Sequence, residues 1–181
     1  MDNVTLIFEG PDRCGKSSLI ELFRKKHHDF RLEKMRVPKQ LHEAVNWYED
    51  FFRSTCNEGG NKVWDRGHIS EAVYAPLYRD YCHVNWPATL WKYEETYFSG
   101  QAVFIVYVYP IWTDLLKPDE RINASIQREL SVYDVALGTS SLPVINITKH
   151  ERKVQAWRSE LAVLAELEDK IDEQLELFSA R

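Results

Sequence analysis

The sequence predicts an α/β protein in which a central five-stranded parallel sheet is flanked by helices. Short apolar runs alternate with longer stretches of helical periodicity along the chain. This alternation is typical of parallel strands joined by right-handed helical crossovers. The run AVFIVYVYP, residues 102–110, is apolar on both faces, as expected of a strand in the interior of such a sheet.

The first half of the chain contains three of the predicted strands. Residues 4–8 (VTLIF) form a β-branched apolar run, and SSLIELFRKKHH after Lys16 predicts a helix with a basic last turn. The next strand is expected at 31–37, where its charges favour the edge of the sheet. A helix is expected at 40–55 and a very short strand at 62–64.

The second half continues the alternation. Helices are expected at 69–81, from Pro87 to Phe98, at about 119–138 with Gly138 as the stop, and at 150–178. The remaining strands are 102–110 and 142–148. Ligands of parallel sheets bind beyond the carboxyl ends of the strands. We therefore expect Gly10, the end of strand 62–64 and Pro110 to meet in one crevice.

Composition limits the class of protein. A chain of 181 residues with 44% hydrophobic and 28% charged residues is expected to form one domain, residues 1–181. The net charge of −5 argues against a nucleic-acid-coating surface. The odd set Cys14, Cys56 and Cys82 predicts reduced thiols. Without a signal-peptide pattern or a run of about 20 apolar residues, we expect a soluble, cytoplasmic protein with no membrane partner.

The strongest motif is GPDRCGKS, residues 10–17, which fits the phosphate-binding pattern G-x-x-x-x-G-K-S between a predicted strand and a predicted helix. Backbone N–H groups of such a loop form a nest for phosphates, and the following helix presents its positive end to them. Lys16 is expected to bridge the β- and γ-phosphates of ATP, and Ser17 to bind Mg²⁺. The predicted ATP-binding residues are Gly10, Pro11, Asp12, Arg13, Cys14, Gly15, Lys16, Ser17 and Ser18.

A second candidate segment is VWDRGHISEAVY, residues 63–74. Asp65 and Arg66 stand at the carboxyl end of a short strand, at the mouth of the predicted crevice. The strand 102–110 ends without the acidic residue of a Walker-B strand, so Asp65 is the best second candidate for Mg²⁺. Arg66 can bind a second anion. A surface ion pair that caps a helix is the alternative interpretation.

These two segments, GPDRCGKSS and DRGHISEAVY, together resemble the thymidylate kinases. That family carries a loop close to G-L-D-R-x-G-K-S and, later, D-R-x-x-x-S-x-x-x-Y. The resemblance covers residues 4–30 and 62–80. Beyond these residues only the order of helices and strands matches the family, including the segment ELSVYDVAL near 129–137. It implies the three-layer P-loop kinase fold, ATP and Mg²⁺ as cofactors, a small nucleotide substrate and the homodimer that is usual among related kinases.

The resemblance also implies roles for individual residues. Asp12 would meet the deoxyribose 3′-hydroxyl of the acceptor nucleotide, Arg13 the transferring phosphates, and Arg66 the acceptor phosphate. With Lys16, the loop residues Asp12 and Arg13 form the predicted catalytic set. Two further residues match the family's motif and are expected to bind the acceptor, Ser70 and Tyr74.

The sequence departs from the family at two places. Val37-Pro38-Lys39 replaces F-P-x-R, so Lys39 could supply the charge for the acceptor phosphate but not a bidentate fork. The family's base-stacking aromatic and its following arginine have no match in spacing, which leaves Phe51, Phe52 and Arg53 as candidates. Phe52 is the expected acceptor contact, with core packing as the alternative.

Three other residues have weaker patterns. His68 follows the Asp-Arg-Gly turn and is expected to line the pocket. A short lid is expected at about 112–123, basic only at Lys117 and Arg121. We expect both lid cations to be solvated and not catalytic.

The leading functional hypothesis is ATP-dependent phosphorylation of a deoxypyrimidine nucleoside monophosphate, with dTMP giving dTDP. A deoxynucleoside kinase is the first alternative and needs a carboxylate base, for which Glu9 is not convincingly placed. A kinase for a hydroxymethylated pyrimidine in nucleotide or DNA is the second. A GTPase-like switch would require an N-K-x-D motif to bind guanine, and residues 146–149 do not match that motif.

Overall fold

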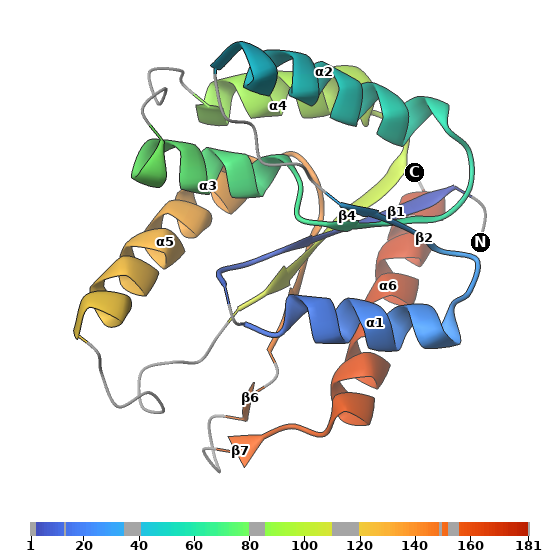
Figure 1. The fold of residues 1–181 in the computed structure, drawn as a ribbon. Helices are drawn as coiled ribbons and strands as arrows, with labels where there is room; N and C mark the ends of the chain where they lie inside the picture. The colour runs from blue at the N-terminus through green and yellow to red at the C-terminus, as the bar shows by residue number, and fades with distance from the viewer. Residues whose placement is uncertain are drawn as a thin grey trace.

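The centre of the molecule is a parallel sheet with the strand order β2-β3-β1-β4-β5 (Figure 1). The computed structural model describes residues 3–12, 14–34, 41–79, 86–109, 120–148, 150–151 and 156–180. The strands of the sheet are β1 (Val4–Glu9), β2 (Arg31–Lys34), β3 (Lys62–Asp65), β4 (Ala102–Val108) and β5 (Val144–Ile147). The predicted five-stranded parallel sheet is therefore confirmed, with the charged strand β2 at an edge as expected.

Helices cover both faces of the sheet, so the fold has three layers (Figure 1). One face packs against α1 (Lys16–Lys26) and α6 (Glu160–Ser179). The other face packs against a group of four helices: α2 (Leu41–Asn57), α3 (His68–Tyr78), α4 (Trp86–Tyr97) and α5 (Glu120–Thr139). Within the described residues, no helix is both long and apolar enough to cross a bilayer.

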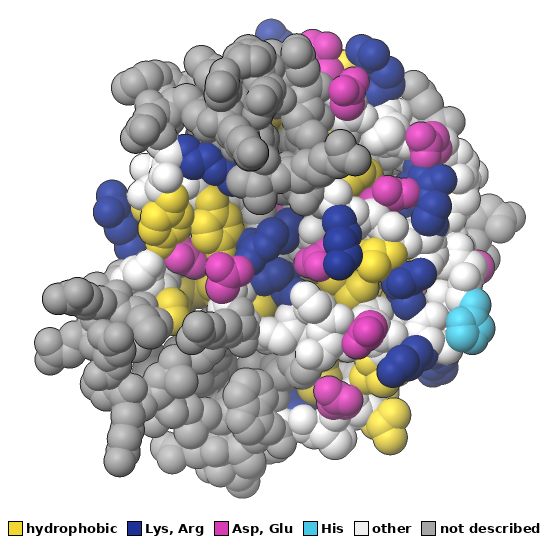
Figure 2. Space-filling model, in the orientation of Figure 1, with side chains coloured by type: hydrophobic (Ala, Val, Ile, Leu, Met, Phe, Trp, Pro, Cys, Tyr) yellow, Lys and Arg dark blue, Asp and Glu magenta, His cyan; other side chains and the backbone are white. Residues whose placement is uncertain are grey.

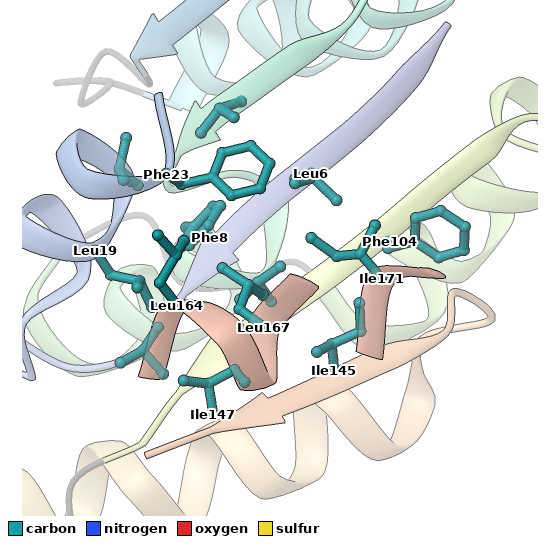
Figure 3. Packing of buried hydrophobic residues seen from close by; sticks show 14 of the residues in the cluster. Leu6, Phe8, Leu19, Phe23, Phe104, Ile145, Ile147, Leu164, Leu167 and Ile171 are labelled. Carbon is teal, nitrogen blue, oxygen red and sulfur yellow. The ribbon is translucent and has the colours of Figure 1, made fainter. Parts of the chain in front are cut away.

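The core divides into two clusters because side chains alternate across a strand. In β1, Leu6 and Phe8 join the cluster beneath α1 and α6, while Ile7 joins the cluster beneath the other four helices. Figure 3 shows the first cluster, in which Leu164 and Leu167 of α6 meet the sheet. Both faces of the sheet are apolar, so each helical layer is fixed against it by burial.

The end of the chain differs from the prediction of one helix over 150–178. Residues His150–Glu151 (β6) and Ala156–Trp157 (β7) pair as antiparallel strands, and α6 begins only at Glu160. The start of α6 is fixed by Ser159, whose Oγ accepts a hydrogen bond from the N–H of Ala162 at 3.2 Å. The prediction that Gly138 ends the preceding helix was also wrong, because α5 continues to Thr139.

The expected crevice forms at the carboxyl ends of the strands. Phe8 of β1 is in register with Asp65 of β3, and the N–H of Arg66 donates to the Phe8 carbonyl at 3.0 Å. Gly10 has φ of +137°, and a Cβ there would lie 2.2 Å from the Val108 carbonyl oxygen at the end of β4. Only glycine fits this position, so the end of β1 and the end of β4 meet closely. Pro110 lies outside the described residues.

Candidate active site

The loop that the sequence predicts to bind phosphate, residues 10–15, connects β1 to α1. Gly15 occupies the N-cap of α1 in the left-handed region, with φ of +89°, a conformation that glycine adopts without strain. The free N–H groups of the first turn of α1 therefore face the loop, which is the arrangement that binds anions. Arg13, a predicted catalytic residue, lies outside the described residues.

Lys16 turns its ammonium group back into the loop. Its Nζ donates to the carbonyl oxygens of Gly10 at 2.6 Å and Pro11 at 2.7 Å. The side chain is buried, and burial lowers the pKa of Lys16 below its ordinary value. Burial also raises the pKa of the neighbouring Cys14 thiol. The loop thus holds a desolvated cation, which strengthens its attraction for phosphate.

A pocket of about 470 Å³ opens beside the loop. The pocket brings together residues that the sequence predicts to bind phosphate or Mg²⁺, and one residue that was not predicted, Lys34. The residues that line it are Asp12, Gly15, Lys16, Ser17, Ser18, Lys34, Asp65 and Arg66. Ser17 and Asp65 offer a hydroxyl and a carboxylate, which are the hard oxygen donors that Mg²⁺ prefers. In the described part of the chain, no group of three or more His, Cys, Asp or Glu side chains could hold a metal by itself. The residues present therefore fit Mg²⁺ held jointly by the protein and by phosphate oxygens.

Arg66 connects the loop to α3. Its Nη2 lies 2.5 Å from Asp12 Oδ1, and its Nη1 donates to the Gly10 carbonyl at 3.3 Å. The backbone of Arg66 is in the left-handed region, with φ of +69°, which costs roughly 1–2 kcal/mol for a residue with a Cβ. Such strain is concentrated at functional sites. The guanidinium is thus held beside the phosphate loop by the fold.

The side chain of Glu9, at the end of β1, holds the start of α3 in place through hydrogen bonds. Its carboxylate has no exposed surface and accepts hydrogen bonds from the N–H groups of Gly67 at 2.9 Å and Ser70 at 3.1 Å. Ser70 Oγ also donates to Glu9. A Cβ on Gly67 would lie 2.6 Å from Ile7 Cγ2, so the chain must be glycine at this turn. With its oxygens occupied in this way, Glu9 is a structural group and not a free base.

A second pocket, of about 320 Å³, lies along α3. It brings together four predicted acceptor residues and three others; its lining is Asp12, Arg66, Ser70, Glu71, Tyr74, Tyr78 and Arg79. Its volume is at the lower end of the roughly 300–1,000 Å³ of small-molecule sites. In Figure 2, hydrophobic side chains gather over the region of α3 and α5, with basic and acidic side chains beside them. Asp12 and Arg66 line both pockets, so they form the boundary between the two.

The second pocket has an aromatic wall. The rings of Tyr74 and Tyr78 stack with centroids 5.9 Å apart, and the Arg66 guanidinium lies 4.8 Å from the Tyr74 centroid. Both tyrosine hydroxyls donate to Glu129 of α5, at 3.2 Å and 2.6 Å. Beneath them, the fully buried Tyr133 donates to the Gly10 carbonyl at 3.0 Å. The wall is therefore tied to α5 and to the phosphate loop.

Two expectations at the acceptor side, Phe52 and His68, were wrong, and the candidate Arg53 lies elsewhere. Phe52 has no exposed surface and stacks on Tyr93, with ring centroids 5.2 Å apart, so it belongs to the core and cannot stack on a base. His68 is also fully buried, and its Nε2 lies 2.7 Å from Glu94 Oε1. Arg53 is exposed, lies near Glu49 and lines neither pocket. The buried Phe51 packs edge-on against Trp64.

Several predicted residues cannot be placed. Lys39 and Lys117 lie outside the described residues, as does most of the expected lid. The side chain of Arg121 is likewise not described, although its backbone is in α5.

Sequence reasoning missed four residues of the pockets, Lys34, Glu71, Tyr78 and Arg79. A usable signal existed for Tyr78, because a residue four positions after Tyr74 lies on the same face of a helix. The position of Lys34 at the end of a parallel strand was a second signal.

No protein-family model and no curated protein matches the sequence. Solved structures do share the fold. The YorR protein of Bacillus subtilis, solved in complex with phosphorylated GDP, is 20% identical with a TM-score of 0.67 over 98% of this chain and 99% of that one. Polyphosphate kinase 2 from Arthrobacter aurescens is 16% identical, with a TM-score of 0.63 over 94% of this chain and 68% of that one. Thymidylate kinase from Ehrlichia chaffeensis is 10% identical, with a TM-score of 0.58 over 93% of this chain and 98% of that one. At these identities the likeness establishes the fold alone, which this chain shares with these three proteins.

Proposed function

We propose that this protein is an ATP-dependent nucleotide kinase whose acceptor is a deoxypyrimidine nucleoside monophosphate, with dTMP converted to dTDP. The observation that carries the proposal is the meeting of two pockets at Asp12 and Arg66. One pocket contains the phosphate loop and Lys16, and the other is lined by two arginines, two acidic residues and two stacked tyrosines. The thymidylate kinase-like motifs and the thymidylate kinase among the fold neighbours support this choice of acceptor.

On the donor side, the protein must position the phosphates of ATP and neutralise their negative charge. The N–H groups at the start of α1 bind the phosphates of ATP, and Lys16 exchanges its partners Gly10 and Pro11 for β- and γ-phosphate oxygens. Ser17 and Asp65 would hold Mg²⁺, which supplies charge neutralisation for the transferring phosphoryl group. Arg13 is assigned to the same oxygens on the strength of the motif.

On the acceptor side, the phosphate of the acceptor nucleotide must reach the γ-phosphoryl group of ATP. Arg66 binds the acceptor phosphate through its fork, and Asp12 turns to the 3′-hydroxyl of the sugar. An oxygen of the acceptor phosphate bonds to the γ-phosphorus while the bond to the β–γ bridging oxygen breaks, so ADP leaves with that oxygen. A phosphate is already anionic, so no base is required, in agreement with the occupied carboxylate of Glu9.

One observation favours a hydroxyl acceptor as the second candidate. Asp12 is exposed at the boundary between the two pockets, which is where a base for a nucleoside or a hydroxymethylated pyrimidine would be needed. In either case we propose a single cytoplasmic domain, residues 1–181, and a homodimer as the assembly.

The test is release of ADP with a panel of acceptors: dTMP, dUMP, other nucleoside monophosphates, nucleosides and an oligonucleotide that carries a hydroxymethylated pyrimidine. The proposal predicts turnover with dTMP and none with nucleosides. Turnover only with nucleosides or with the oligonucleotide would establish the second candidate. ADP release that no acceptor increases would contradict both.

A further inference from the structure

We infer that a further pocket, at the end of the sheet opposite the active site, binds a small organic cation. Its ammonium group would lie against Glu95 and its apolar body against aromatic side chains. The inference goes beyond the proposed function, because no residue that lines this pocket lines either pocket of the active site. We call it the far pocket.

The far pocket has a volume of about 320 Å³ and lies where β4 and β5 begin. Val103 and Phe104 stand at the start of β4, and Pro143 directly precedes β5. Figure 1 shows the end of α6 beside the start of β4, and Phe178 of α6 also lines the pocket. The phosphate loop lies at the opposite ends of the strands, and the seven residues of β4 span about 20 Å. The two sites are therefore separate.

One side of α4 faces this pocket. It contributes four lining residues: Trp91, Glu94, Glu95 and Phe98. Their spacing of three and four positions places them on one side of a helix. The N–H of Phe98 donates to the Glu94 carbonyl at 2.8 Å, so the helical spacing continues through Phe98. Trp91 is 49% exposed, which leaves part of a large aromatic side chain open to a ligand.

The pocket carries negative charge. Among the described residues that line it, Glu94 and Glu95 are charged and none is basic. Glu94 is buried and accepts hydrogen bonds from Ser140 Oγ at 2.7 Å and from the N–H of Ser141 at 2.6 Å, which stabilise its ionised form. His68 and the hydroxyl of Ser141 occupy its remaining acceptor positions, so Glu94 contributes charge and not a direct contact. Glu95 is exposed, and no described side chain pairs with it.

Three helices end beside the pocket and add to this charge. The last residues of α4, α5 and α6 each lie within two positions of a lining residue, namely Phe98, Ser141 and Phe178. The carboxyl end of a helix carries partial negative charge, which basic side chains in the last turn offset. The last turn of α1 contains three basic residues, whereas those of α4, α5 and α6 contain none.

These features select the class of ligand. Trp and Phe rings attract a cation to their faces, and a carboxylate accepts charge-assisted hydrogen bonds from an ammonium group. An anion would be repelled by the two glutamates. Nowhere in the described ranges do three or more His, Cys, Asp or Glu side chains gather to hold a metal ion. An ammonium group on an aromatic or aliphatic body therefore matches both the charge and the apolar surface of the pocket.

The test is calorimetric binding of phenethylamine, phenethyl alcohol and phenylpropionate to the full chain without nucleotides. The three probes share a phenyl body and differ in charge. Phenethylamine should bind at least about tenfold more tightly than the alcohol, the value of roughly one charge-assisted hydrogen bond. Phenylpropionate should bind more weakly than the alcohol.

Two variants locate the site. Glu95→Gln should reduce the preference for the amine over the alcohol by about tenfold, because it removes the exposed carboxylate and keeps its shape. Trp91→Ala should weaken binding of both probes, because it removes aromatic surface that they share. The matched control is Glu21→Gln on α1, an exposed glutamate that does not line the pocket, and it should bind as wild type does.

The same measurements can overturn the inference. Equal binding of amine and alcohol by wild type, or an unchanged preference in Glu95→Gln, would contradict it. A loss of preference in Glu21→Gln as well would show attraction by the overall negative charge and not by a site. ATP and dTMP should not displace phenethylamine, and displacement by either would place the amine in the active site. Because the readout is binding, failure of the proposed kinase reaction would leave these outcomes unchanged.

Discussion

Asp12 in the phosphate loop and Arg66 at the start of α3 form an ion pair with 2.5 Å between Oδ1 and Nη2, across 54 positions of sequence. Asp12 is 80% exposed, while Arg66 is 22% exposed and has three further hydrogen-bond partners. The aspartate can therefore leave the pair at small cost, because exposed ion pairs contribute about 0–1 kcal/mol. An acceptor phosphate can take its place on Arg66.

Lys16→Ala should abolish ADP release. The ammonium group lies inside the phosphate loop on two carbonyl oxygens, and its removal deletes the cation that follows the β- and γ-phosphates. Steady-state kinetics with saturating ATP and dTMP measures this. Lys26→Ala is the matched control, because Lys26 is exposed and pairs with Glu168 on the surface. More than a tenth of wild-type turnover in Lys16→Ala would contradict the assignment.

Arg66→Lys should raise the KM for the acceptor monophosphate and leave the KM for ATP nearly unchanged. Lysine keeps the charge but loses the fork that binds a phosphate through two parallel hydrogen bonds. We expect an increase of about tenfold, the value of roughly one charge-assisted hydrogen bond. An effect on ATP alone would place Arg66 on the donor side.

Glu9 tests whether a general base is present. Glu9→Gln keeps the shape of the side chain and an acceptor for the N–H groups of Gly67 and Ser70, so most of the turnover should remain. Glu9→Ala should instead lower the free energy of unfolding by about 1–3 kcal/mol for each buried donor left unpaired, as measured by urea denaturation. A glutamine variant that folds normally but does not turn over would identify Glu9 as a base and favour a hydroxyl acceptor.

Glu94 should make the fold sensitive to acid. Burial alone would raise the pKa of Glu94, but hydrogen bonds from His68, Ser140 and Ser141 outweigh it and hold the pKa below the ordinary value of 4.5. The folded state then binds fewer protons than the unfolded state below about pH 4.5, so this group's stabilisation is present above that pH and is lost as pH falls through the folded pKa.

Glu94→Gln should therefore lower the free energy of unfolding at pH 7 by about 1–3 kcal/mol, the order expected when a buried hydrogen-bonding partner is left unsatisfied. Urea denaturation at pH 7 and at pH 3.5, a value chosen about one unit below the ordinary pKa, measures the difference from wild type. We expect that difference to shrink at the lower pH. A difference that is equal at both pH values would show that Glu94 is not ionised in the folded protein.

The sheet and the phosphate loop could be predicted because their signals are local. Apolar runs such as β4 specify a buried strand, and the glycines and lysine of residues 10–17 specify a nest between strand and helix. The start of α6 could not be placed from periodicity, because helical and short strand segments with mixed charge look alike over a few residues. The cap at Ser159 decides it.

The acceptor side was predicted less well because its residues depend on tertiary packing. Phe52 has the composition of a stacking residue, yet its place on α2 directs it into the core against Tyr93. The Glu71–Arg79 pair joins two ends of one helix at a spacing that ordinary i,i+4 rules do not cover. Ion pairs of this kind are visible only in the fold.

The most direct test of the account compares Asp12→Asn with Asp65→Asn, each with dTMP and 3′-deoxy-dTMP across a Mg²⁺ titration. Asp12 lies at the boundary between the two pockets, and Asp65 lines only the pocket beside the phosphate loop. Wild type should use the 3′-deoxy acceptor poorly, and Asp12→Asn should narrow the gap between the two acceptors with the Mg²⁺ profile unchanged. Asp65→Asn should shift the Mg²⁺ profile and leave the preference for the 3′-hydroxyl intact. The opposite pattern, with Asp12→Asn altering the metal profile and Asp65→Asn the sugar preference, would contradict the assignment of one pocket to each substrate.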